Sequence, residues 1–332
     1  MKSLILGGST FVGRRTVEQL REAGHEVTVL NRGKTTSELP EGVSRIVGDR
    51  TSTESMRAAL EGTEWDSVID VSGFVMAAGG GLFEDLIDLL DGRVGSYVFV
   101  SSIMAYAPTG IMPWTEDQPY RDDPDTTYGG FKAHAERVIL DRHVRTNFPG
   151  SIARPAAIYG PDNNIHDMET AMFLRLRKGL PVLVPHEGLV TTSYGHVDDL
   201  VTNLIEMSKL PKAAGEVFNI TGQGCSAIEY VHQLADIVGV TPEIINVPTG
   251  YTTEGPLFGH LFKDRHHGIL SVEKAADFGL TVERGFRLGH EQTYDWFCAS
   301  PVADSPDVLA DPMWGAGYDF GLEAKYAEEL RA

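Results

Sequence analysis

The chain has 332 residues, of which 47 are acidic and 28 basic, and this balance gives a formal net charge of −19. A negative field of this size repels extended polyanions, and the sequence has no run of lysines and arginines long enough to override it. Nucleic acid is therefore not an expected partner. A nucleotide-sized ligand is compatible with the charge, because a few backbone amides and one or two arginines can hold a diphosphate.

Hydrophobic residues make up 42% of the chain and charged residues 23%, as in an ordinary globular protein. The two cysteines, Cys225 and Cys298, lack the spacing of a disulfide framework or a metal site, so we expect a reducing compartment and no bound metal. No apolar stretch approaches the roughly 20 residues of a membrane span. Gly7 ends the apolar start of the chain too early for a signal peptide. These features predict a cytoplasmic protein without membrane contact.

The amino-terminal half alternates short apolar runs with segments of helical periodicity. Strands are predicted at residues 4–6, 26–30, 45–47, 67–71, 96–100 and 151–153, and helices at 12–23, 54–60, 82–90 and 128–146. Repeated strand–helix alternation with short connections is typical of a parallel sheet covered by helices on both faces. The fold class expected is therefore α/β, with a doubly wound Rossmann sheet.

The pattern becomes less regular after Arg154. Further helices are predicted at residues 168–178, 197–207, 227–238 and 322–330, between short strands rich in proline and glycine, and residues 301–317 resemble an extended arm. We expect residues 1–160 to form a dinucleotide-binding domain. Residues 161–332 would form mainly a smaller α/β substrate-binding region, interleaved with the last strands of the sheet, with Trp296 and Phe297 in its core.

A glycine-rich loop joins the first predicted strand to the first helix. A strand, a glycine turn and a helix in succession allow backbone amides at the helix start to face a pyrophosphate. Gly7 would supply the tight turn and Gly13 the close helix-to-strand contact, while Thr10 stands where such loops commonly have a middle glycine. A glycine motif alone also suits a plain turn, but this context predicts a dinucleotide site. Its expected contacts are Gly7, Ser9, Thr10, Phe11, Val12 and Gly13.

The end of the second predicted strand bears on the choice of dinucleotide. An acidic residue there accepts the ribose hydroxyls of NAD, whereas a basic one accommodates the 2′-phosphate of NADP. The residues present are Asn31, Arg32, Gly33 and Lys34. Arg32 can pair with a phosphate through two hydrogen bonds, although these charges can also be a solvated surface. The sequence favours NADP, with NAD as the alternative.

A tyrosine and a lysine begin the long helix predicted at residues 128–146. Tyr128 and Lys132 are four residues apart and so share one face of the helix. A phenol has a pKa of about 10 and acts as an acid or base near neutrality only when a cation stabilises its phenolate. Ser101 and Ser102 follow the strand that ends at Val100, at the sheet edge where α/β proteins bind ligands. A serine there can orient a substrate oxygen while the tyrosine moves its proton.

These motifs together resemble the extended short-chain dehydrogenases/reductases, the group that contains NAD(P)-dependent epimerases and dehydratases of sugar nucleotides. The resemblance spans nearly the whole chain and includes the segments 48–50, 153–161 and 195–200. It implies that Ser102, Tyr128 and Lys132 are the catalytic residues, with Ser102 chosen over Ser101 by its spacing to Tyr106. It also implies cofactor contacts from Asn31 and Arg32, from Asp49 and Arg50 after the third strand, and from Ser72, as well as a homodimer.

The resemblance also limits the reactions that can be expected. Dehydratases and decarboxylases of the family carry acidic residues just after the catalytic serine or threonine, whereas this chain has Ile103, Met104 and Ala105. Dehydration is therefore disfavoured. Oxidation, reduction or epimerisation of a secondary alcohol remains, with a nucleotide-linked sugar as the expected small-molecule substrate. An NADP-type site leans towards a net reductase.

A second hypothesis comes from a branch of the same fold. The glycine loop, with the segments 31–33 and 48–50, is also similar to the chloroplast stem-loop RNA-binding proteins. This likeness raises the alternative of a cofactor-sensing or RNA-binding protein without dehydrogenase turnover. The net charge and the complete catalytic set argue against it.

Two further sets of polar residues have structural interpretations that do not involve catalysis. Asp198 and Asp199, near His196, are expected to cap a helix start rather than take part in acid–base chemistry. Arg175, Arg177 and Lys178 are either contacts for a substrate phosphate or a solvated helix face.

Overall fold

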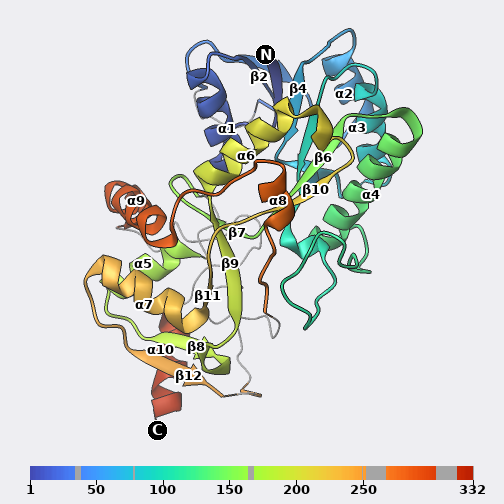
Figure 1. The fold of residues 1–332 in the computed structure, drawn as a ribbon. Helices are drawn as coiled ribbons and strands as arrows, with labels where there is room; N and C mark the ends of the chain where they lie inside the picture. Colours follow the sequence, from blue (N-terminus) through green and yellow to red (C-terminus); the bar gives the residue numbers. More distant parts are fainter. Residues whose placement is uncertain are drawn as a thin grey trace.

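A computed structural model describes residues 1–33, 39–77, 79–163, 168–248, 250–251, 267–303 and 320–331. Its largest element is a seven-stranded sheet in the order β10-β6-β5-β4-β1-β2-β3, in which every neighbouring pair is parallel (Figure 1). The strands are β1 Lys2–Leu6, β2 Glu26–Asn31, β3 Ser44–Val47, β4 Ser67–Asp70, β5 Tyr97–Val100, β6 Gly150–Pro155 and β10 Val217–Ile220. Strands β4 and β5 are buried along their whole length, as expected where helices cover both faces.

Helices cover both faces of this sheet and form a separate apolar core on each. One core joins the sheet to α1 Phe11–Glu22 and α6 Val197–Lys209. The other joins it to α2 Thr53–Leu60, α3 Leu82–Leu90 and α4 Tyr128–Thr146. This arrangement confirms the predicted doubly wound Rossmann fold.

The sheet draws on both halves of the sequence. Strand β10 pairs with β6 through Val217 and Ile152, and it comes after residue 160, as does helix α6. A short helix, α8 Glu273–Asp277, packs beside β10. The part of the chain after residue 160 therefore supplies one edge strand and one covering helix to the seven-stranded sheet.

The remaining elements form a smaller region below the sheet in Figure 1. Two small sheets lie there, β11-β9-β7 and β12-β8. Their strands are β7 Ala157–Tyr159, β8 Val182–Pro185, β9 Thr191–His196, β11 Gly224–Ser226 and β12 Ile244–Val247, and the helices are α5 Glu169–Arg177, α7 Ala227–Val238, α9 Phe286–Ala299 and α10 Phe320–Arg331. Phe297 is fully buried in the core of this region and Trp296 packs against it, which confirms the prediction for both. Of the predicted arm at 301–317, residues 304–317 lie outside the described residues.

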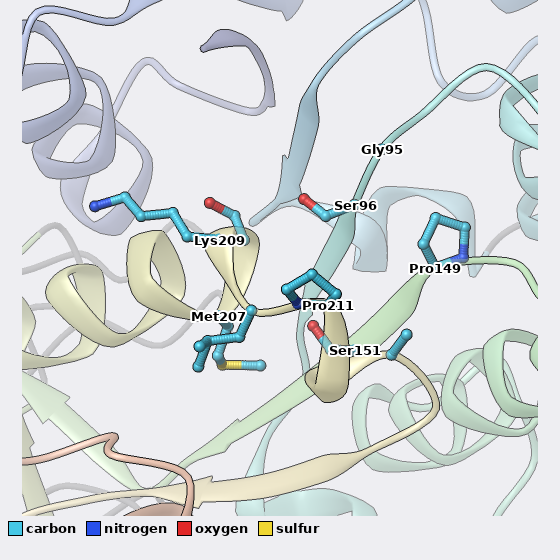
Figure 2. Close-up of a pocket in the computed structure, with 10 residues that line it drawn as sticks. Gly95, Ser96, Pro149, Ser151, Met207, Lys209 and Pro211 are labelled. Carbon is cyan, nitrogen blue, oxygen red and sulfur yellow. The ribbon is translucent and has the colours of Figure 1, made fainter.

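A small hollow lies at the amino-terminal edge of the main sheet (Figure 2). Ser96 just before β5 and Ser151 in β6 line it, together with the end of α6 around Lys209. Ligands in open α/β sheets bind at the opposite edge, outside the carboxyl ends of the strands. The hollow is therefore separate from the predicted site, and no predicted site residue lines it. Within the part of the chain that the structure describes, no helix is both long and apolar enough to cross a bilayer.

Candidate active site

The carboxyl ends of the central strands bring the predicted site residues together at one edge of the sheet. Strand β1 lies between β2 and β4, so the order of the strands reverses beside it, and this is where dinucleotides bind in doubly wound sheets. The glycine loop follows β1, Ser72 follows β4 and Ser102 follows β5. The start of α4, with Tyr128, packs against the short 3₁₀ turn η2 at Ile103–Ala105.

Two glycines of the loop allow the backbone to approach closely. Gly7 has a φ of +104°, and a Cβ there would overlap the side chain of Ser72. A Cβ on Gly13 would overlap the carbonyl of Gly7, so only glycine lets α1 start this close to β1. Thr10 precedes α1 and is exposed, and its hydroxyl does not cap the helix. Backbone amides and an exposed hydroxyl at a helix start fit the pyrophosphate of a dinucleotide.

The end of β2 holds a small polar network next to this loop. The Nδ2 of Asn31 donates to Ser9 Oγ at 2.9 Å, and its Oδ1 accepts from the backbone of Gly33 at 3.0 Å. The side chain of Asn31 is thus held in place without a negative charge. Arg32 beside it is exposed, whereas Lys34 lies outside the described residues. Asp49, at the end of β3, accepts a hydrogen bond from the backbone N–H two residues further on, at 3.0 Å.

Arg50 occupies an interior position behind the cofactor edge. It is buried, and its Nη1 and Nη2 donate to the two carboxylate oxygens of Asp70 at 2.7 and 2.5 Å. Nη1 also donates to Ser72 Oγ at 2.8 Å, and Ser72 Oγ donates to the carbonyl of Leu6 at 3.1 Å. The hydroxyl of Tyr97 adds a third bond to Asp70, at 2.8 Å. Arg50 thus helps to fix the side chain of Ser72 at the end of β4.

Ser102, Tyr128 and Lys132 lie together at the start of α4. The hydroxyl of Ser102 lies close enough to the phenol of Tyr128 to favour its phenolate. Ser102 Oγ also accepts from the backbone N–H of Met104 at 3.1 Å. Lys132 is buried, with its Nζ 5.5 Å from the ring centroid of Tyr128. That Nζ donates to the carbonyl of Val100 at 2.6 Å, which ties α4 to the end of β5. The structure thus assembles the three side chains predicted to be catalytic.

Burial shifts the pKa of both groups on α4 that are predicted to be catalytic. Burial raises the pKa of Tyr128, and the nearby hydroxyl of Ser102 opposes that rise. Burial lowers the pKa of Lys132 to about 8, although the nearby Asp70 carboxylate favours its charged form. A lysine with a pKa of about 8 beside the ring of a half-buried tyrosine is typical of a site for proton transfer.

Sequence reasoning missed a buried carboxylate next to this group. Glu136 is fully buried one turn beyond Lys132 on α4. It binds Arg154 from β6 and the hydroxyl of Ser101. The spacing of Tyr128, Lys132 and Glu136 by four residues places all three on one helix face. This spacing is visible in the sequence and could have identified Glu136.

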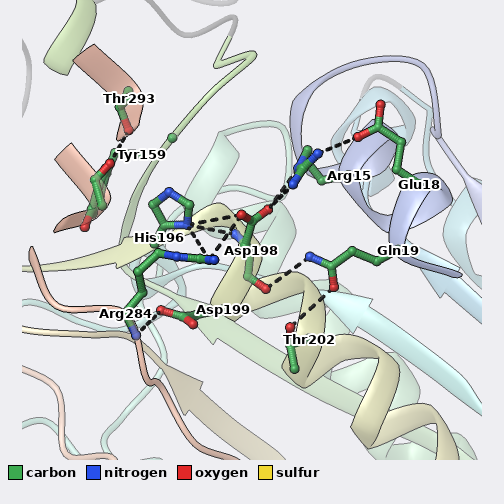
Figure 3. A network of polar contacts seen from close by, with 12 residues as sticks. Arg15, Glu18, Gln19, Tyr159, His196, Asp198, Asp199, Thr202, Arg284 and Thr293 are labelled. Carbon is green, nitrogen blue, oxygen red and sulfur yellow. Dashed lines mark hydrogen bonds and ion pairs between the residues drawn. The ribbon is translucent and has the colours of Figure 1, made fainter. Parts of the chain in front are cut away.

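A second polar network joins α1 to the lower region (Figure 3). Asp198, in the first turn of α6, accepts from Arg15 Nε at 2.9 Å and from Arg284 Nη1 at 3.1 Å. The expectation that Asp198 and Asp199 cap α6 is wrong, because the cap is His196, whose Nδ1 accepts from the backbone of Asp198 at 3.2 Å. Burial lowers the pKa of His196 to about 4, so this histidine is neutral at physiological pH.

Two further predictions can be compared with the structure. Arg175 is fully buried and paired with Glu323 of α10, so it neither reaches a substrate phosphate nor belongs to a solvated face. Both interpretations given to it from the sequence are wrong. Among the described residues, no group of three or more histidine, cysteine, aspartate or glutamate side chains is arranged to hold a metal ion.

Comparison with known proteins places the chain in a family. The model of the NAD dependent epimerase/dehydratase family matches residues 3–221. The chain belongs to this family. The match begins in β1 and ends just after β10, so it contains the whole main sheet and every residue of the candidate active site.

Relatives of known name within this family differ in what they do. The chain is 28% identical to the chloroplast stem-loop binding protein of 41 kDa b from Arabidopsis thaliana, over 82% of this chain and 73% of that protein. It is 26% identical to 2′-dehydrokanamycin reductase from Streptomyces kanamyceticus, over 67% and 62% of the two chains. It is 31% identical to dTDP-glucose 4,6-dehydratase from Streptomyces griseus, over 47% of each chain. Most of these alignments leave a large part of the relative uncovered.

Solved structures of the family share the fold. The UDP-glucose 4-epimerase of Thermotoga maritima, solved with UDP-glucose, superimposes with a TM-score of 0.74 at 20% identity, over 90% of this chain and 99% of that one. The dTDP-glucose 4,6-dehydratase of Bacillus anthracis, solved with NAD, gives a TM-score of 0.75 at 19% identity, over 90% and 97%. The family and its members support a nicotinamide-dependent oxidoreductase or epimerase, and they leave the exact reaction undetermined.

Proposed function

We propose that this protein is an NADP(H)-dependent short-chain reductase or epimerase that acts on a secondary alcohol or ketone of a nucleotide-linked sugar. One arrangement carries the proposal: Ser102 and Tyr128 lie beside each other at the sheet edge, where the start of α4 packs on η2, and Nζ of the buried Lys132 lies 5.5 Å from the tyrosine ring centroid. A serine, a phenol and an ammonium group in this arrangement can hold a carbinol oxygen and move its proton.

The residues divide the proton chemistry among themselves. Ser102 would donate to the substrate oxygen and fix its position beside the phenol of Tyr128. Tyr128 would deliver a proton to that oxygen in reduction and accept one in oxidation. The charge of Lys132 would stabilise the phenolate that Tyr128 then becomes, which lowers the cost of the transfer. A bound nicotinamide supplies the hydride chemistry.

The binding of the dinucleotide would rest on the glycine loop and the ends of β2 and β3. Gly7, Thr10 and Gly13 would face the pyrophosphate, with Ser9, Phe11 and Val12 completing the loop. Ser72 would lie beside the ribose, with Asp49 near the adenine. Arg50 would act by holding Ser72, to which it is bonded.

The charge at the end of β2 favours NADP over NAD. Asn31 lacks the carboxylate that would repel a 2′-phosphate, and its amide is already engaged by Ser9 and Gly33. Arg32 beside it is exposed, and its guanidinium would pair with the 2′-phosphate. NAD remains the alternative cofactor.

Replacement of Arg32 by alanine should weaken NADPH binding by about 10-fold or more and leave NADH binding nearly unchanged, because a charge-assisted hydrogen bond contributes roughly 1.5–3 kcal/mol. Fluorescence titration of each cofactor measures this difference. Arg45→Ala is a matched control, since Arg45 is an exposed arginine on the neighbouring strand β3. An equal loss for both cofactors would refute the role in 2′-phosphate binding.

The function itself is tested by cofactor titration followed by a substrate screen. NADPH and NADH are titrated first, and nucleotide sugars with hydroxyl or keto groups are then screened for a change in nicotinamide absorbance or in sugar configuration. We expect cofactor binding in the micromolar range and turnover of a sugar nucleotide. Absence of cofactor binding together with binding of a stem-loop RNA would overturn the proposal in favour of the RNA-binding alternative. We also expect a homodimer, which sedimentation analysis of the full chain would measure.

A further inference from the structure

Glu136 is a buried carboxylate with an unusual number of partners. Its side chain has no solvent exposure. Its Oε1 accepts from the hydroxyl of Ser101, and its Oε2 accepts from the hydroxyl of Tyr120 at 3.0 Å. Arg154 supplies the remaining donors. A buried carboxylate with this many donors has one fixed orientation, because any rotation would break several bonds in a site that water cannot reach.

Arg154 holds the carboxylate from the end of β6. Its Nε lies 3.0 Å from both oxygens of Glu136, and its Nη2 lies 2.6 Å from Oε2. Its Nη1 donates to the carbonyl of Glu116 at 3.2 Å, and its guanidinium stacks over Tyr106, 4.3 Å from the ring centroid. The pair is therefore neutral as a unit and anchored to both β6 and the segment that follows η2.

Ser101 connects this anchored carboxylate to the catalytic serine. Its backbone N–H donates to the carbonyl of Ala153 at 2.7 Å, which extends the pairing of β5 with β6 by one residue. Ser102 has an extended backbone, with φ −166° and ψ 153°, so the two adjacent side chains point to opposite sides. The hydroxyl of Ser101 donates to Glu136, while that of Ser102 lies beside the phenol of Tyr128. Glu136 and Tyr128 both belong to α4, so this helix interacts with both serines of the strand end.

We infer that Ser101 and Glu136 are positioning residues: Glu136, held by Arg154, fixes the hydroxyl of Ser101 and thereby the strand end that presents Ser102 to Tyr128. The inference rests on the proposed hydride-transfer function. It assigns no contact with substrate or cofactor to either residue. It explains why the hydroxyl next to the catalytic serine is turned away from the site and bonded to a charge.

Ser101→Ala is the variant that separates positioning from stability. It removes one bond to Glu136 and leaves the pair with Arg154 intact, so the protein should fold. Ser67→Ala is the matched control, because Ser67 is an equally buried serine of the same sheet, bonded to Ser3 at 2.9 Å near the opposite edge. We expect Ser101→Ala to lower kcat by about 10- to 100-fold with KM and cofactor affinity unchanged, since small misplacement costs rate. Ser67→Ala should keep the kcat of the wild type.

A second measurement needs neither substrate nor cofactor. In protein labelled with ¹³C at tyrosine Cζ, the resonance of Tyr128 is assigned by its absence from Tyr128→Phe. Ser101→Ala should shift this resonance, because the position of Ser102 beside the phenol of Tyr128 changes, and Ser67→Ala should leave it in place. An unshifted resonance would overturn the inference, as would an unchanged kcat. If the wild type turns over no substrate, the proposed function fails, and the resonance alone still decides whether Ser101 positions the pair.

Discussion

Tyr128→Phe should abolish turnover while cofactor affinity stays within about twofold of the wild type. The phenol of Tyr128 lies beside Ser102, the serine that would hold the substrate oxygen, so it is placed to exchange a proton with that oxygen. Loss of a positioned acid or base costs about 10²- to 10⁴-fold in rate. The ring itself remains, packed edge-to-face on Phe74 with centroids 5.1 Å apart, so the fold should be unaffected.

The measurement is kcat with the best substrate of the screen, beside a fluorescence titration of NADPH. Tyr251→Phe serves as the control, because it removes a hydroxyl that binds Glu329 of α10, far along the chain from the site. Turnover by Tyr128→Phe within tenfold of the wild type would rule out Tyr128 as the proton donor.

Lys132→Met should remove activity and at the same time stabilise the protein. Burial lowers the pKa of Lys132 to about 8, from 10.5 for a free lysine. Below the folded pKa the lysine is charged in both the folded and unfolded states, and the folded state bears the cost of burying that charge. The cost is about 3 kcal/mol below pH 8 and declines to zero as pH rises to the unfolded pKa, because the unfolded chain then loses its proton as well. Methionine avoids this cost at every pH. It also removes the bond from Nζ to the carbonyl of Val100, which contributes only about 0.5–1.5 kcal/mol.

The free energy of unfolding of wild type and Lys132→Met would be measured by denaturant titration at about pH 7 and about pH 9.5. We expect the stabilisation by methionine to be larger at the lower pH. Lys325→Met is the control, since Lys325 is exposed on α10 and should show no such difference. A destabilised Lys132→Met, or a difference that grows with pH, would contradict the assignment of a costly buried charge.

The main sheet could be predicted closely because its strands are buried and bounded by clear signals. Strand β5 has the sequence Tyr-Val-Phe-Val and is buried throughout, and α4 begins and ends where the periodicity predicts. The small sheets of the lower region could not be predicted in the same way. Strand β9 has the sequence Thr-Thr-Ser-Tyr-Gly-His, which lacks both an apolar run and an alternating pattern. Its pairing is decided by tertiary contacts.

The grouping of Tyr128 and Lys132 in the candidate site could be predicted because their spacing lies within one helix. The buried ion pairs around the site could not be predicted. Tyr128 and Lys132 share a helix face, which the sequence shows directly. Arg50 pairs with Asp70 and Arg175 with Glu323, 148 residues away. An arginine at a strand end looks the same in the sequence whether it faces solvent, a phosphate or a buried carboxylate. Only the arrangement in space distinguishes these three environments.

Strand β10 and helix α6 belong to the main sheet but come after residue 160 in the sequence. This order limits how proteins of this architecture can be recombined. A chimera spliced after residue 160 would lack both elements. The outer edge of β6 would then present unpaired N–H and carbonyl groups, and the apolar face that α6 covers would be open to solvent. Bare edges of this kind invite association with other chains. A graft that exchanges substrate specificity must therefore replace the stretches on either side of α6 and β10 and leave the two elements with their original sheet.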